Sequence, residues 1–135
     1  MPPNLISIDS SNFNRSKLRI INAPKLQRLS YGVFQECYTL EQAILPECTY
    51  LEDRVFYSCS KATIIDLGKV TTMGEKVFNY VTGDVYIRTP TICQMKGPTQ
   101  HFKGRFLVPV TLVDEYKTAE NWSDWADQIF AIEEE

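Results

Sequence analysis

A Val-Phe doublet recurs along this chain at a constant spacing. Its copies begin at Val33, Val55 and Val77, so consecutive copies are 22 residues apart. A self-similar period of about 20–50 residues is typical of stacked repeats, in which each unit buries its apolar face against its neighbours. Residues 40–59, LEQAILPECTYLEDRVFYSC, carry the unit most clearly. The period therefore constrains the architecture more tightly than it constrains a ligand.

When the sequence is written in rows of 22 residues, apolar side chains recur at the same positions of successive rows, here called columns. One column holds Ile21, Ala43, Ile65 and Ile87, and another holds Ala23, Leu45, Leu67 and Thr89. A column of Pro and Gly comes next, and these residues continue a β-ladder poorly. Each unit is therefore predicted to contain a short strand, a turn, a second extended piece and a single helical or 3-10 turn that carries the Phe.

The recurring aromatic and thiol positions are candidates for a buried core. Phe34, Phe56 and Phe78 occupy one column, and Cys37 and Cys59 share another with Val81. A column that accepts Cys and Val is typical of a core position, where a free thiol behaves as a small apolar group. Equivalent positions on adjacent coils lie roughly 5 Å apart. A Cys37–Cys59 disulfide is therefore a geometrically possible alternative to two free thiols.

Composition excludes some classes of protein. The chain has 135 residues, a length typical of one domain, and a net charge of −3, which argues against nucleic-acid binding. No apolar run approaches the about 18 residues that a membrane-spanning helix needs, so no membrane insertion is expected. The N-terminus has no signal-peptide pattern. We therefore expect a cytoplasmic or virion-associated chain, or a secreted or cell-surface one if it is a fragment of a longer precursor.

Catalytic constellations are not visible in the sequence. His101 is the only histidine, and it lies in a Gly/Pro-rich segment after Met95 that is predicted to be a loop. No nucleotide-binding loop, nucleophile motif or zinc-ligand spacing is present. We predict that the chain is not an enzyme and that it has no catalytic residue, no metal site and no cofactor.

The two ends of the chain depart from the period. Leu5, Ile8, Phe13 and Ser16 match the next unit at an offset of 21, which predicts a half repeat over residues 1–17. Repeats of full length are predicted over residues 18–104. Residues 105–135 are predicted to form a cap, within the same structural domain. Because terminal repeats normally carry a polar cover, the uncapped start suggests further chain or an assembly partner there, or else simple fraying.

The cap is predicted to contain a strand over 105–109 and helices over 110–130. Thr111 is expected to start the first helix, and Ser123 is expected to cap the second. Trp122 and Trp125 lie three positions apart. They are expected to fill the end of the solenoid, and stacking on sugar rings is the alternative.

These features resemble the BspA-type leucine-rich repeat of microbial surface proteins. Residues 40–59 carry the resemblance best, and the third repeat departs from it at Ala62, Gly68 and Val81. The C-terminal segment resembles the cap of the family at Val108-Pro109, Tyr116, Ala119, Asn121-Trp122, Ala126, Ile129 and Ile132. The resemblance implies a β-rich α/β leucine-rich-repeat solenoid of about four coils with a C-terminal helical cap. It also implies a secreted or cell-surface binding role without catalysis.

Strand alternation predicts which side chains face solvent. If Ile21 and its equivalents point inward, their neighbours point outward. The predicted outward residues are Ile20, Asn22, Gln42, Ile44, Ile64, Asp66, Tyr86 and Arg88. Solenoid proteins bind partners through such faces, although these residues could serve only cross-strand pairing.

The prediction for function is a non-catalytic binding module. It would recognise a protein or a glycan through the exposed strand face, in surface adhesion. The alternative is a structural or attachment subunit of a virion or surface fibre, docked through the N-terminal half repeat.

Overall fold

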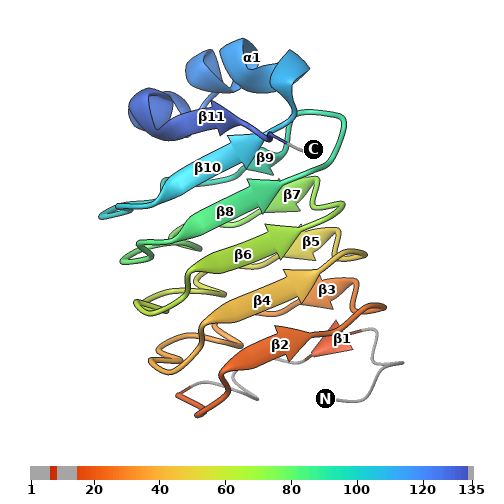
Figure 1. Ribbon diagram of the computed structural model, residues 1–135, viewed down its shortest axis with the longest axis vertical. Helices are drawn as coiled ribbons and strands as arrows, with labels where there is room; N and C mark the ends of the chain where they lie inside the picture. Colours follow the sequence, from red (N-terminus) through yellow and green to blue (C-terminus); the bar gives the residue numbers. More distant parts are fainter. Residues whose placement is uncertain (1–6, 9–14, 134–135) are drawn as a thin grey trace.

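The computed structural model describes residues 7–8 and 15–133 of the chain. Successive coils stack along one axis and contribute strands alternately to two parallel sheets (Figure 1). The predicted β-rich leucine-rich-repeat solenoid is therefore confirmed. In the described part, no helix has the length and apolar character needed to cross a bilayer.

The longer strands form a six-stranded sheet in the order β11-β10-β8-β6-β4-β2, with every neighbouring pair parallel. Its strands are β2 (Ile20–Asn22), β4 (Gln42–Leu45), β6 (Ile64–Leu67), β8 (Asp84–Ile87), β10 (Arg105–Val108) and β11 (Ile129–Ala131). Apolar side chains at alternate positions of β4, β6 and β8 are buried, which is the period expected of a half-buried strand.

Two-residue strands form the second sheet, in the order β1-β3-β5-β7-β9. They are β1 (Ser7–Ile8), β3 (Arg28–Leu29), β5 (Tyr50–Leu51), β7 (Thr72–Met73) and β9 (Gln94–Met95). Four coils contribute one strand to each sheet, from β2 with β3 to β8 with β9. The prediction of a strand, a turn and a second extended piece holds in all four.

The Phe-bearing segments are runs of turns, so the predicted helical turn is wrong. In the first coil, Gly32 and Glu36 have φ angles of 59° and 59°, which no right-handed helix allows. The left-handed residues turn backbone N–H groups toward the next coil. Phe34 N donates to Val55 O at 3.1 Å, and Glu36 N donates to Tyr57 O at 2.7 Å. Bonds between coils thus alternate with local turn bonds, such as Gln35 N to Gly32 O at 3.0 Å.

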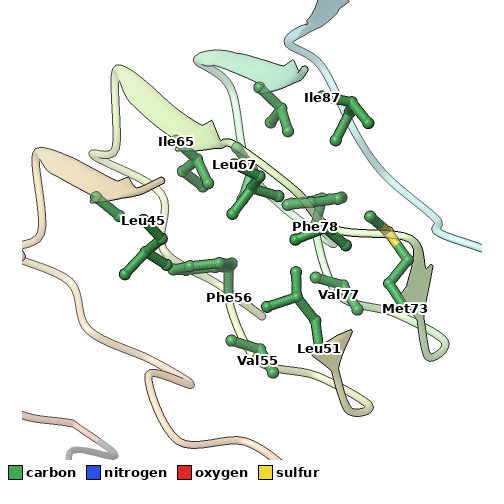
Figure 2. Close-up of a cluster of buried hydrophobic side chains, with 14 of the residues drawn as sticks. Leu45, Leu51, Val55, Phe56, Ile65, Leu67, Met73, Val77, Phe78 and Ile87 are labelled. Carbon is green, nitrogen blue, oxygen red and sulfur yellow. The ribbon is translucent and has the colours of Figure 1, made fainter. Parts of the chain in front are cut away.

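A spine of phenylalanine rings runs between the two sheets. The ring centroids of Phe34 and Phe56 are 5.8 Å apart, and those of Phe56 and Phe78 are 6.2 Å apart, both pairs stacked. All three side chains are fully buried. Figure 2 shows Phe56 and Phe78 among aliphatic side chains from both sheets, such as Leu67. Phe102 packs on Phe78 at 6.4 Å and extends the spine.

The fourth coil enters its strand two residues earlier than the 22-residue rows predict. Val85 pairs with Ile65, and Ile87 pairs with Leu67. The assignment of Ile87 and Thr89 to the columns of Ile65 and Leu67 is therefore wrong. Gly83 permits the shorter turn, since a Cβ at this position would collide with the backbone of Ala62 and Thr63. A longer connection after β8 restores the period.

The return to the 22-residue period is visible in the second sheet. Met95 pairs with Met73 at the original spacing. The inward position just before β9 is taken by Cys93, which is fully buried, while Ile92 is only half-buried. The column that groups Ile92 with Cys48 is thus displaced by one residue.

The cap contains β10, η1 (Val110–Leu112), α1 (Val113–Thr118), η2 (Ser123–Gln128) and β11. The strand predicted over 105–109 is confirmed, since β10 ends just before Pro109. The helical prediction holds only in part, because residues 129–131 are the strand β11, parallel to β10. The predicted helix starts are wrong: Thr111 lies inside η1, Ser123 is the first residue of η2, and neither helix has a side-chain cap hydrogen bond.

Trp122 fills the end of the solenoid. Its side chain is 1% exposed, and its ring contacts Phe106 at 4.9 Å and Tyr116 at 4.9 Å. Trp125 is half-buried and meets Phe102 edge-on at 5.8 Å. Sugar stacking on Trp122 is therefore excluded, and the core expectation is correct for this residue.

The N-terminal half repeat is described only at two places. Ile8 pairs with Leu29, and Ser16 Oγ lies 3.5 Å from Cys37 Sγ, both as the offset of 21 predicts. Leu5 and Phe13 lie outside the described residues. The division of the chain at residues 17 and 104 remains a prediction.

Candidate functional site

The outward side chains of the six-stranded sheet form one continuous surface, here called the strand face. In the strand register, one row contains Ile20, Gln42, Ile64, Asp84 and Arg105, and the other contains Asn22, Ile44, Asp66, Tyr86, Leu107 and Phe130. Seven of the eight predicted outward residues lie in these rows. Arg88 follows the end of β8 instead, because the register of the fourth coil is shifted. Asp84 takes the place beside Ile64.

Apolar groups on the strand face are incompletely covered. Ile20 is 55% exposed and Phe130 is 44% exposed, whereas Ile44, Ile64 and Tyr86 are half-buried. Exposed large apolar side chains along one sheet are a feature of interaction surfaces. The face therefore offers apolar contact area along its whole length.

The charged groups of the face are arranged as ion pairs between coils. Arg88 donates to Asp66 through Nε at 2.7 Å and Nη2 at 3.1 Å, and its guanidinium lies 4.9 Å from the Tyr86 ring centre. Two parallel hydrogen bonds of this kind fix the geometry of both side chains. The sequence prediction included both members but did not anticipate their pairing.

A second pair repeats this arrangement one coil further on. Arg105 donates to Asp84 through Nε at 2.9 Å and Nη2 at 2.7 Å. Hydrogen bonding to Asp84 raises the pKa of Arg105 further above its ordinary value. With both carboxylates paired, the C-terminal half of the face presents little net charge.

The C-terminal end of the strand face contains a hollow of about 300 Å³. Residues of β8, β10, β11 and the segment after β11 line it. They are Tyr86, Arg105, Leu107, Phe130, Ala131 and Glu133. Of these, only Tyr86 was predicted. Phe130 was missed because residues 110–130 were predicted to be helical, and Arg105 and Leu107 were missed because the strand predicted over 105–109 was assigned to the cap and not to the strand face. The sequence shows no polar–apolar alternation here, because Ile129, Phe130 and Ala131 are all apolar.

The cysteines belong to the core and not to the site. All four side chains are buried, and Cys48, Cys59 and Cys93 are free thiols. Burial raises the pKa values of Cys48 and Cys93 to about 12. Cys37 and Cys59 are hydrogen-bonded neighbours, so the pKa of Cys37 is lowered to about 6 while that of Cys59 is raised. Within residues 15–133, no three His, Cys, Asp or Glu side chains lie close enough together to hold a metal ion.

Comparison with known families agrees with this architecture. A family model described as the BspA type leucine rich repeat region matches residues 1–95 in six copies. The chain belongs to the BspA-type leucine-rich repeat family. The family match ends at the last residue of β9, so the cap lies beyond it, as do all residues that line the hollow except Tyr86. No curated protein gives a significant match.

Proposed function

We propose that this BspA-type chain is a protein-binding module that uses its strand face, with the hollow at the C-terminal end as the main anchor site. The hollow is the observation that carries the proposal. It brings Tyr86, Phe130 and Arg105 together at one place. Tyr and Arg are enriched among the residues that dominate binding energy at protein interfaces. Membership of a repeat family that stacks coils into extended faces supports the same function.

The occupant of the hollow is a partner side chain with an apolar stem and a polar end, because aromatic rings stand there beside the Arg105 guanidinium and the Glu133 carboxylate. Tyr86 and Phe130 supply the apolar walls, and the Arg105 guanidinium lies 5.8 Å from the Phe130 ring centre. Since Arg105 is held by Asp84, it is oriented before the partner arrives. A guanidinium that is already fixed beside the aromatic walls loses little conformational freedom on binding.

The extent of the strand face favours a protein over a glycan at this surface. Six parallel strands spaced about 4.8 Å apart give a face about 24 Å across. A face of this width is larger than one sugar residue and accommodates the core of a protein–protein interface. Ile20, Ile44 and Ile64 continue the apolar surface from the hollow to the opposite end of the face.

Site-specific photo-crosslinking tests the proposal. A photoreactive phenylalanine analogue would replace Phe130 or Tyr86 in the full chain, in cells that express it. The matched control places the analogue at Tyr31, which is 43% exposed but lies in a turn away from the strand face. We expect one protein to be trapped from both face positions and not from Tyr31. Equal trapping from all three positions would contradict the proposal.

Joint replacement of Tyr86 and Arg88 is the simplest disruption suggested by the sequence, but the structure recommends a different pair. Removal of Arg88 would leave the Asp66 carboxylate without its bidentate partner. Tyr86→Ala with Phe130→Ala removes the anchors and leaves both ion pairs intact. This double variant should retain the melting temperature of the parent within a few degrees.

A role in adhesion at the cell surface is part of the same proposal, and antibody labelling of intact cells against lysed cells tests it. The assembly-subunit alternative remains a prediction, because most of the N-terminal half repeat lies outside the described residues. Light scattering after size-exclusion chromatography separates the two. A monomer agrees with a stand-alone module, and an obligate oligomer favours the assembly subunit.

A further inference from the structure

A second hollow of about 300 Å³ lies away from the strand face. Its lining residues are Ser60, Tyr80, Thr82, His101 and Lys103. They come from the turns that lead into β6, β8 and β10, so three successive coils contribute to it. Nothing in the proposed protein-binding function uses this corner of the solenoid.

The floor of this hollow is a rigid aromatic shelf. The Tyr80 and His101 rings are stacked with their centroids 5.1 Å apart and their planes 7° from parallel. Tyr57 meets Tyr80 edge-on at 5.6 Å from the other side. Tyr80 nevertheless remains 43% exposed. An exposed aromatic group held by its neighbours offers an apolar surface to the C–H groups of a ligand at little entropic cost.

The polar groups of the hollow are suited to an anion with hydroxyl groups. Thr82 Oγ1 donates to the Ser60 carbonyl at 3.3 Å, which leaves its lone pairs available as acceptors. The Lys103 ammonium makes no ion pair with any residue from 15 to 133. No carboxylate lines the hollow. In a chain of net charge −3, an unpaired lysine beside hydroxyl groups is a local site of positive potential.

The earlier coils have the same backbone at this corner but different side chains. Tyr80, Ser58 and Glu36 all have left-handed backbones, with φ angles of 67°, 62° and 59°. The shelf is therefore absent where the equivalent residue is Ser58, and a carboxylate replaces it at Glu36. The left-handed backbone recurs at this corner of each coil, and Tyr80 in the later coil supplies the aromatic group.

We infer that this hollow binds an acidic pyranose, a six-membered sugar ring that bears a carboxylate. The C–H face of the sugar ring packs on the exposed aromatic surface of Tyr80 and His101, and the carboxylate pairs with Lys103. The sugar hydroxyls donate to Thr82 and Ser60. The site is independent of the strand face, so a glycan and a protein partner can occupy the chain together.

Amide chemical-shift mapping on the full chain tests the inference, with methyl β-glucuronide as the probe and methyl β-glucoside as its neutral counterpart. We expect saturable shifts at Tyr80, Thr82 and Lys103 with the glucuronide, and binding of the glucoside weaker by about fivefold or more. Equal affinities for the two sugars would overturn the role of Lys103. An absence of saturable shifts at these amides would overturn the site.

Two variants test separately the role of Lys103 in binding the carboxylate and the role of Tyr80 in packing on the sugar ring. Lys103→Met should weaken glucuronide binding about fivefold, whereas Lys25→Met, at another exposed lysine, should leave it unchanged. Tyr80→Ser, which installs the side chain of the preceding coil, should abolish binding while the rest of the spectrum keeps its folded pattern. Sodium sulfate serves as the probe for a plain anion site. If it shifts the same amides with the same affinity, the sugar-binding inference is wrong.

Discussion

The indole Nε1 of Trp122 donates a 2.9 Å hydrogen bond to the backbone carbonyl of Cys93. The backbone N–H of Cys93 donates to the Tyr116 hydroxyl at 2.7 Å. A third cap residue, Asn121, donates through Nδ2 to the Met95 carbonyl at 2.7 Å. The five-stranded sheet ends at β9, so these side chains satisfy polar groups that a further coil would otherwise pair. The cap thus closes an edge that would be open to association with other chains.

Trp122→Phe should destabilise the chain by about 1–3 kcal/mol, since it leaves the buried Cys93 carbonyl without its donor while keeping most of the aromatic packing. Urea unfolding followed by circular dichroism measures this. Val110→Ala is the control, because Val110 is 70% exposed and should change stability by less than about 0.5 kcal/mol. Equal unfolding midpoints for Trp122→Phe and the parent would show that the hydrogen bond contributes nothing.

Phe56→Ala should cost about 3–5 kcal/mol, because Phe56 is fully buried and stacks on a ring at each side. Phe56→Leu retains most of the volume and should cost clearly less. The same urea experiment compares the two, with the exposed Phe130→Ala as a matched aromatic control. A loss below about 1 kcal/mol for Phe56→Ala would contradict the buried spine.

Gly83→Ala should destabilise the chain by about 1–3 kcal/mol, because the added methyl group would meet the Ala62 carbonyl and force the fourth coil outward. An Ala that the native backbone accepted would instead stabilise slightly, by restricting the unfolded chain. The sign of the change in unfolding free energy therefore decides whether the turn before β8 is sterically closed. A stabilised variant would refute the close approach of these two coils.

Stability should fall as the pH rises from 9 toward 12, because burial raises the pKa of Cys48 to about 12 from an ordinary value of 9.0. The stability that the neutral Cys48 thiol contributes is fully present below pH 9. It is lost as the pH rises toward 12, because between these values the thiol ionises in the unfolded chain and not in the folded chain. The slope is at most about 1.4 kcal/mol per pH unit for one thiol.

The control for this pH dependence is Cys48→Val, which places there the residue found at Val70 in the next coil. The variant should keep the neutral-pH stability within about 1 kcal/mol and lose part of the alkaline slope. Chemical denaturation at a series of pH values provides both numbers. Parallel slopes for the parent and the variant would show that Cys48 does not titrate on unfolding.

Residue columns alone were sufficient to predict the stacking of coils. Phe34, Phe56 and Phe78 repeat because each fills the same place in the core, so identical side chains report identical positions. The pattern could not reveal the shifted register at β8. Ile87 fits an inward column with or without the shift, so its apolar character does not reveal the register. The close backbone approach at Gly83, which accompanies the shift, has no counterpart in the repeat pattern. Left-handed residues such as Arg54 and Ser58 are also hidden, because neither residue type favours that conformation.

The candidate site was predictable only where strand alternation continued unbroken. Tyr86 was identified because it precedes Ile87, which was placed in an inward column, and a register shift of two residues leaves the inward–outward alternation unchanged. Phe130 was missed, since the spacing of Trp122 and Trp125 is also compatible with a helix that continues through residue 130. The hollow depends on β11 returning to the sheet beside β10, which is a long-range pairing that local patterns do not encode.

The dissociation constant of the crosslinked partner, measured with purified proteins, tests the binding role of the strand face most directly. The parent, the Tyr86→Ala/Phe130→Ala double variant and Tyr31→Ala would be compared, with melting curves recorded for each. We predict binding at least about 100-fold weaker for the double variant, which is more than about 2.7 kcal/mol, and a change below about twofold for Tyr31→Ala. An unchanged dissociation constant in a double variant that melts like the parent would contradict the assignment of this face as the binding surface.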